Sequence, residues 1–258
     1  MKIMRFVYQG EMAYGVVSGE NLRKIEGWPS GPYKIAEETI LIEEVKVLAP
    51  LIPGKIVAVG LNYASHVAEV SREQKAPPAP LLFLKPPTAV IGPGEGIFYP
   101  EKCRELHYEG ELAVIIKKRA RKIRLEETAD YILGYTCLND VTARDWQRSD
   151  GQWTRGKSYD TFCPIGPVVA LDIQDPNALK IETRLNGRVR QSASTADLLF
   201  KVEELVSYIS HYMTLLPGDI IATGTPEGVG PMKVGDTVEV EIEEIGVLRN
   251  QVIEDPGQ

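Results

Sequence analysis

The chain has 258 residues, 43% of them hydrophobic and 25% charged, so it can bury a sizeable core without disulfides or a structural metal. Its formal net charge of −7 argues against general binding to nucleic acid or to an anionic membrane, although a local basic pocket is not excluded. Three scattered cysteines, no signal-peptide pattern and no membrane-spanning apolar run together predict a cytoplasmic protein with reduced thiols.

Residues 1 to about 50 are predicted to form a small β-rich N-terminal domain. The runs “MRFVYQG” and “MAYGVVSG” are short, β-prone and punctuated by glycine. Prolines and a glycine in “APLIPGK” mark a boundary, which leaves residues 51–258 as a second domain. That domain begins with “KIVAVG”, a run typical of a buried strand.

Strands and turns dominate the second domain. The segment “LHYEGELAVIIKK” is predicted to be a strand, and Asn-Gly in “ETRLNGRVRQSA” predicts a hairpin. A terminal hairpin is expected in “GDTVEVEIEEIGVLRNQV”, turning near Gly246. Helices are few: the clearest is predicted over Asp197 to Tyr212, with short ones at “RLEETADY” and “YASHVAEV”. The expected class is therefore β-rich α+β, not a doubly wound sheet.

Three carboxylates are candidates for a metal site. Glu109 and Glu111 alternate onto one face of their strand, and Asp140 ends the next β-like segment, “ILGYTCLND”. A Glu-x-Glu pair more often lies on a solvated sheet face, but Ala113 and Ile115 share this face. Three acids together would repel unless a cation neutralises them, and oxygen ligands favour Mg²⁺, with Mn²⁺ or Ca²⁺ as alternatives.

The segment “NYASHVAEV” offers a candidate acid–base pair. On a helical turn, His66 and Glu69 are i, i+3 neighbours, and the carboxylate can orient the imidazole. Spacing alone favours an ordinary exposed helix with an incidental pair.

Further polar residues follow. Arg144 offers a planar fork that suits a carboxylate, and Lys157 follows a glycine without a Walker pattern. For both, surface charge is the simpler interpretation. Thr225 lies in “IIATGTPEGVGP”, where a buried strand leads into a glycine-rich loop, and its hydroxyl could bind a ligand there.

Taken together, these stretches resemble the fumarylacetoacetate hydrolase family from about Lys55 to Val252. The pieces that carry the resemblance are “GLNYASHVAE”, “FLKPPTAVIGPG”, “HYEGELAVII”, “LNDVTARDWQ”, “GKSYDTFCPIGP” and “LLPGDIIATGTPEGVGP”. The resemblance implies a β-rich roll with a mixed sandwich, and a homodimer. It also implies that the first 50 or so residues are the small N-terminal domain of many bacterial members.

The resemblance assigns roles position by position. It implies metal ligands at Glu109, Glu111 and Asp140, and substrate contacts from Arg144, Gln147 and Thr225. It also implies a catalytic set of His66, Glu69 and Lys157, with the His-x-x-Glu pair on a mobile lid as in the shorter, single-domain branch. The founding hydrolase has an additional acidic ligand upstream of its histidine. Because “VAVGLNYASH” contains no acid, fumarylacetoacetate itself is in doubt as the substrate.

The expected activity is metal-dependent C–C bond hydrolysis of an acylpyruvate-type 2-oxo acid through a stabilised pyruvate enolate. The same enolate would serve a 2-hydroxyhepta-2,4-diene-1,7-dioate isomerase or decarboxylase, or an oxaloacetate decarboxylase or tautomerase, and the metal residues do not distinguish these reactions. A more distant alternative is a cation-stabilised binding protein without turnover. The partners expected are a small 2-oxo acid and a second copy of the chain, without nucleic acid or membrane.

Overall fold

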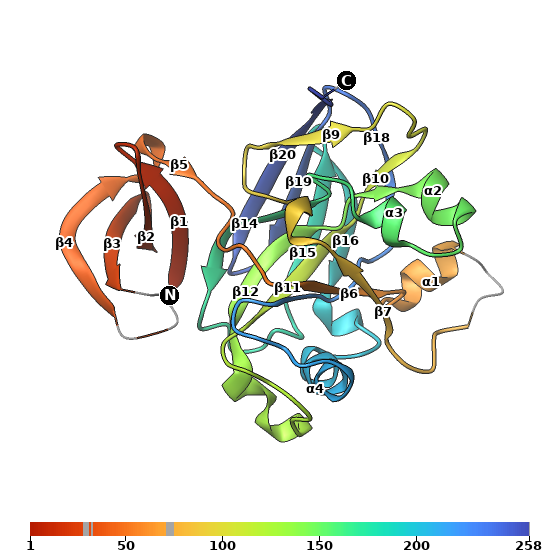
Figure 1. Ribbon diagram of the computed structural model, residues 1–258, viewed down its shortest axis with the longest axis horizontal. Coiled ribbons are helices and arrows are strands. Elements are labelled where there is room, and N and C mark those ends of the chain that lie inside the picture. Colours follow the sequence, from red (N-terminus) through yellow and green to blue (C-terminus); the bar gives the residue numbers. More distant parts are fainter. Residues whose placement is uncertain (28–30, 32, 71–74, 258) are drawn as a thin grey trace.

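The computed structural model describes residues 1–27, 31, 33–70 and 75–257. Within these residues the chain is β-rich with few helices, which confirms the predicted class (Figure 1). The helices are α1 (Ala64–Val70), α2 (Arg144–Ser149), α3 (Thr154–Lys157) and α4 (Val202–Tyr212), with 3₁₀ turns at Ile42–Glu44, Pro87–Ala89, Leu125–Tyr131 and Thr195–Asp197. No helix in the described part of the chain is long and apolar enough to cross a membrane.

The largest sheet runs through the whole molecule. In spatial order its main path is β4 (Tyr33–Leu41), β3 (Asn21–Gly27), β2 (Glu11–Ser18), β1 (Lys2–Tyr8), β14 (Cys163–Ala170), β12 (Ile132–Asn139), β11 (Gly110–Ile116), β17 (Ile220–Ala222), β6 (Ile56–Gly60) and β7 (Leu81–Lys85). Two short strands lie off this path, β5 (Lys46–Val47) beside β1 and β8 (Val90–Ile91) beside β14.

Two smaller sheets complete the fold. One has the order β16 (Arg188–Ser194), β15 (Lys180–Leu185), β19 (Thr237–Ile242), β20 (Gly246–Glu254) and β9 (Gly96–Tyr99). The other joins β13 (Thr142–Ala143), β10 (Leu106–Tyr108) and β18 (Gly230–Met232). The predicted hairpins are confirmed: β15 and β16 turn at Asn186 and Gly187, which both have positive φ, and Gly246 opens β20 opposite Ile242.

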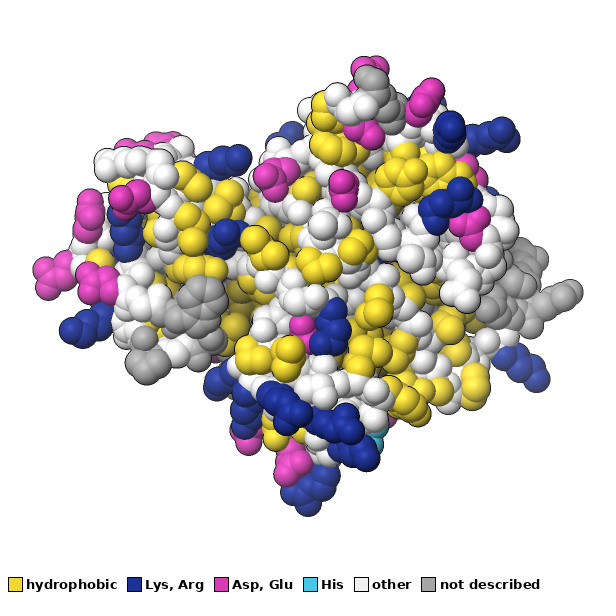
Figure 2. All heavy atoms as spheres, in the orientation of Figure 1, with side chains coloured by type: hydrophobic (Ala, Val, Ile, Leu, Met, Phe, Trp, Pro, Cys, Tyr) yellow, Lys and Arg dark blue, Asp and Glu magenta, His cyan; other side chains and the backbone are white. Residues whose placement is uncertain are grey.

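Strands β1 to β5 form a lobe beside the larger body (Figure 1). The lobe joins the main sheet through a short register of β1 with β14, Lys2 opposite Ala170 and Ile3 opposite Val169. Hydrophobic side chains reach the surface where the lobe meets the body (Figure 2).

Strand β11 is buried on both faces. On one face Leu112 and Val114 join a core with β15, β19 and α4. On the other face Ala113 and Ile115 pack with side chains of β6, β14 and β17. This double burial fixes the direction in which the strand presents its polar end.

Two predicted elements differ from the structure. The strand expected over “LHYEGELAVIIKK” is broken at Glu109, where the chain leaves the sheet of β10 and enters the main sheet. The helix expected over Asp197–Tyr212 begins only at Val202. The buried Asn62 side chain bonds both the N–H (2.8 Å) and the C=O (3.0 Å) of Phe200, and so holds the preceding segment out of the helix. “RLEETADY” forms a 3₁₀ turn, and “YASHVAEV” contains α1 as predicted.

Candidate metal centre and active-site cavity

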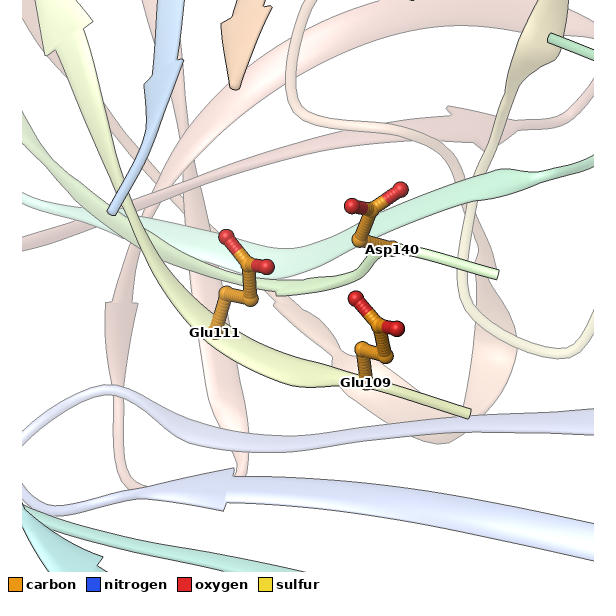
Figure 3. A group of neighbouring side chains, drawn as sticks. All are labelled: Glu109, Glu111 and Asp140. Carbon is orange, nitrogen blue, oxygen red and sulfur yellow. The ribbon is translucent and has the colours of Figure 1, made fainter. Parts of the chain in front are cut away.

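The three predicted carboxylates meet where β11 begins and β12 ends (Figure 3). The register places Gly110 opposite Asn139, so Glu109 lies opposite Asp140, whose N–H donates to the Glu109 carbonyl at 2.8 Å. Glu111 lies within β11 and points to the same side. One oxygen of each carboxylate lies within 4.8 Å of the other two, and all three side chains are buried. We call Glu109, Glu111 and Asp140 the acidic cluster.

Cationic side chains of the protein itself surround the acidic cluster. Lys157 Nζ lies 2.7 Å from Glu109 Oε2 and 2.6 Å from Asp140 Oδ2, and Arg144 forms an ion pair with Glu109. Lys85 Nζ lies 2.6 Å from Asp140 Oδ1. Interpreting Arg144 and Lys157 as surface charges is therefore wrong, because both are buried. We call Lys85, Arg144 and Lys157 the cation trio.

Glu111 differs from the other two acids. Within the described residues it forms no ion pair, and its carboxylate accepts one hydrogen bond, from Gly224 N–H at 2.8 Å. Burial, followed by the negative charges of Asp140 and Glu109, holds the pKa of Glu111 well above its usual value. Burial also acts to raise the pKa of Glu109, but the charges of Lys157 and Arg144 outweigh it and the pKa is lowered. Glu111 is thus the buried acid that lacks a cation.

The acidic cluster fits a hard divalent ion. All its ligand atoms are oxygens, which are the ligands that Mg²⁺ and Mn²⁺ prefer, and one oxygen from each of the three residues lies within 4.8 Å of the other two. Glu111, buried without a cation partner, is the group that an ion would stabilise most. The cluster contains neither histidine nor cysteine, the ligands that zinc sites in proteins most often use.

A cavity of about 230 Å³ opens onto the acidic cluster. It brings together the predicted residues from separate elements: its lining includes Glu109, Glu111, Asp140, His66, Arg144, Gln147, Lys157 and Thr225. Arg144 also donates to Gln147 Oε1 at 2.5 Å, which fixes the two side chains as one unit. A second cavity of about 300 Å³, lined mostly by aliphatic side chains near Tyr14 and Ile52, does not include the acidic cluster.

His66 and Glu69 form a close pair on α1. His66 Nδ1 lies 3.0 Å from Glu69 Oε2, and the imidazole is buried and lines the cavity. The other Glu69 oxygen accepts the Gly228 N–H at 2.9 Å, which anchors α1 to the glycine-rich loop. A carboxylate oxygen that faces Nδ1 favours the tautomer with its proton on Nδ1, which leaves a lone pair on Nε2. Spacing alone favoured an incidental pair on an exposed helix. The structure instead places His66 in the wall of the cavity.

Sequence reasoning missed three residues of the site. The sequence alone assigns no role to Lys85. The one feature that could have indicated a role is that a lysine directly ends the apolar run in “LLFLK”. Phe83 and Trp153 line the cavity, with ring centroids 5.2 Å apart in an edge-to-face arrangement, and Lys157 Nζ lies 5.0 Å from the Phe83 ring centroid. Gly60 is required beside them, because a Cβ there would lie 2.5 Å from the Trp153 ring.

Comparison with known proteins gives two family matches. The model described as fumarylacetoacetate (FAA) hydrolase C-terminal matches residues 55–253. The model described as Rv2993c-like, N-terminal matches residues 1–50.

Individual relatives carry several enzyme names. A mitochondrial oxaloacetate tautomerase FAHD2A of Bos taurus is 45% identical over 222 residues, covering 81% of this chain and 70% of the relative. The crystal structure of 2-hydroxyhepta-2,4-diene-1,7-dioate isomerase from Mycobacterium marinum is 41% identical with a TM-score of 0.91, covering 99% of each chain. The maleylpyruvate hydrolase of Sphingobium sp. SYK-6, in complex with manganese(II) ion and pyruvate, is 32% identical with a TM-score of 0.81, covering 98% of this chain and 99% of that one.

Proposed function

This chain belongs to the fumarylacetoacetate hydrolase family, a family of enzymes, and we propose that it is a divalent-metal-dependent hydrolase of C–C bonds in acylpyruvate-type 2-oxo acids. The observation that carries the proposal is the charge balance at the cavity. With all acids ionised, the acidic cluster has three negative charges and the cation trio three positive ones. When a divalent ion is added, the site has a surplus of two positive charges. These match the two negative charges of one substrate, on its carboxylate and on the developing enolate.

The acidic cluster would hold the ion, with Mg²⁺ as the first choice and Mn²⁺ or Ca²⁺ as alternatives. When bound there, the ion would supply Lewis-acid stabilisation of charge at the 2-oxo end of the substrate. The maleylpyruvate hydrolase that this chain resembles was crystallised in complex with manganese(II) and pyruvate, which supports a divalent ion and a 2-oxo acid as the ligands proposed for this chain.

His66 is the base in the proposed mechanism. Its Nε2 takes a proton from a water molecule that attacks the distal carbonyl carbon, while Glu69 holds the ring and stabilises its charged form. The C–C bond to C3 of the pyruvate unit then breaks, and its electrons enter the enolate. Lys157 and Arg144 place fixed positive charge beside that enolate, and protonation at C3 releases pyruvate and a carboxylic acid.

A substrate panel tests the proposal. The metal-free protein is reloaded with Mg²⁺ or Mn²⁺ and offered acylpyruvates, oxaloacetate and the heptadienedioate, and the ultraviolet absorbance of the enols is followed. We expect metal-dependent cleavage of an acylpyruvate, and loss of turnover in Glu109→Ala or Asp140→Ala. Full activity without metal would refute the site, and no change with any compound would favour a binding protein without turnover.

A tautomerase or isomerase is the second candidate, because two relatives are an oxaloacetate tautomerase and a heptadienedioate isomerase. Both reactions move a proton between the 2-hydroxyl oxygen and a carbon of the enol, C3 in oxaloacetate and C3 or C5 in the heptadienedioate, without breaking a C–C bond, and His66 lines the cavity where that proton would move. Product analysis in the same panel separates these outcomes, since hydrolysis releases pyruvate and a second carboxylic acid, whereas tautomerisation and isomerisation release no fragment.

We also propose that the enzyme acts as a homodimer in the cytoplasm. Exposed Ile52 and Met12 beside the apolar cavity offer surface for a second copy, and the three cysteines are buried and unpaired. Sedimentation analysis of the full chain tests the dimer.

A further inference from the structure

We propose that Gln191 is a positioning residue that makes the Thr225 hydroxyl a hydrogen-bond donor toward an anionic oxygen of the substrate. This inference rests on the proposed function and deepens it, because it assigns which side donates in one hydrogen bond between the cavity wall and the substrate.

Gln191 lies on β16 and reaches two parts of the site from the second sheet. Its side chain is buried, and its Oε1 accepts the Gly110 N–H at 3.0 Å, between the two glutamates of the acidic cluster. Its Nε2 donates to Thr225 Oγ1 and to the Pro226 carbonyl, each at 2.8 Å. One amide therefore ties the strand of the acids to the glycine-rich loop.

The orientation of this amide is fixed by its backbone partners. The Gly110 N–H can only donate and the Pro226 carbonyl can only accept, so the oxygen must face Gly110 and the nitrogen must face Pro226. The reversed amide would set donor against donor and acceptor against acceptor. The atom that faces Thr225 is consequently an N–H donor.

This donor determines what the Thr225 hydroxyl can do. A hydroxyl has one proton and two lone pairs, and Gln191 occupies one lone pair. Within the described residues, the hydroxyl proton has no acceptor, although Thr225 is buried and lines the cavity. The proton is thus available to an oxygen of a bound ligand, and a carboxylate or enolate oxygen would take it in a charge-assisted hydrogen bond.

Neighbouring Thr183 provides a matched control. It lies opposite Gln191 in the β15–β16 register, and its buried hydroxyl has no hydrogen-bond partner among the residues that the structure describes. Thr183→Val keeps the shape and removes a hydroxyl that is not part of the link.

The experiment uses the full chain loaded with Mn²⁺ and titrated with oxalate by calorimetry, in Gln191→Met, Thr225→Val, the double variant and Thr183→Val. We expect Thr225→Val to lose about tenfold in oxalate affinity, as for one hydrogen bond to a charged group. Gln191→Met should lose several-fold, and the double variant should bind no more weakly than Thr225→Val. Thr183→Val should match the wild type, and Mn²⁺ affinity should stay constant throughout.

The inference is overturned if Gln191→Met binds oxalate as the wild type does, or if Gln191→Met loses as much affinity in the Thr225→Val background as in the wild-type background. If Gln191→Met fails to fold, the comparison of Thr225→Val with Thr183→Val carries the test, and equal oxalate affinity in these two variants would overturn the inference. A wild-type protein that binds no oxalate with Mn²⁺ would refute both the proposed function and this inference. Oxalate binding that is insensitive to Gln191 would refute the inference alone.

Discussion

Replacing Lys85 with methionine tests whether the cation trio balances the acidic cluster. The Lys85 side chain is buried and donates to Asp140, to the Lys157 carbonyl and, at 3.4 Å, to the Val141 carbonyl. Removing one partner of a buried ion pair lowers the free energy of unfolding by about 3–5 kcal/mol. Because Asp140 still forms its ion pair with Lys157 in the variant, we expect a loss of about 3 kcal/mol. For a chain of this size that loss lowers the metal-free Tm by about 6–12 °C.

Metal should partly reverse this loss. Lys85 repels any cation at Asp140, so the variant should bind Mn²⁺ more tightly, and a tenfold lower Kd adds about 1.4 kcal/mol of stabilisation at saturation. The Tm difference between variant and wild type should then narrow by about 3–6 °C in thermal melts with Mn²⁺. Lys55→Met is the control, because Lys55 pairs with buried Asp219, which is not part of the acidic cluster. Equal Mn²⁺-induced shifts in wild type and Lys85→Met would refute the reasoning.

Three further substitutions test contacts of the same site. His66→Ala should abolish hydrolysis while Mn²⁺ affinity, measured by calorimetry, is retained; survival of hydrolysis would remove the base assignment. The pKa of Glu111 is raised, so the metal-free folded protein keeps a proton that the unfolded chain loses. As the pH rises from the pKa of Glu111 in the unfolded chain to its pKa in the folded protein, the free energy of unfolding should fall by at most about 1.4 kcal/mol per pH unit. Glu111→Gln cannot ionise and should lose this slope in denaturant titrations with chelator; an unchanged slope contradicts the assignment. Gly110→Ala places a Cβ 2.1 Å from Thr183 Oγ1 and should lower the free energy of unfolding by about 1–3 kcal/mol. Adding Thr183→Ala removes the clash, so the double variant should regain most of this stability in thermal denaturation.

The acidic cluster could be predicted because its geometry is local. Alternation along one strand sets Glu109 and Glu111 to one side, and the next strand along the chain supplies Asp140. The β15–β16 hairpin is equally local, since Asn186 and Gly187 determine their own turn.

Other features depend on contacts between distant parts of the chain. Lys85 is 55 residues from Asp140 in sequence, and only the placement of β7 beside β6 brings it to the site. The late start of α4 depends on Asn62, which is 138 residues from Phe200. Burial of Lys157 could not be predicted either, because an isolated lysine is almost always exposed unless buried acids pair with it.

The cation trio also bears on whether the site is catalytic or purely structural. Three buried positive side chains beside three carboxylates let the acids fold together without metal, but they also oppose any cation that binds there. A site that served only to hold an ion would be stronger without them. Lys157 and Arg144 both reach the cavity, so their charge is well placed once an anion arrives with the metal. Positive charge in excess of what the ion requires is therefore expected of a site that binds a metal together with a dianionic substrate.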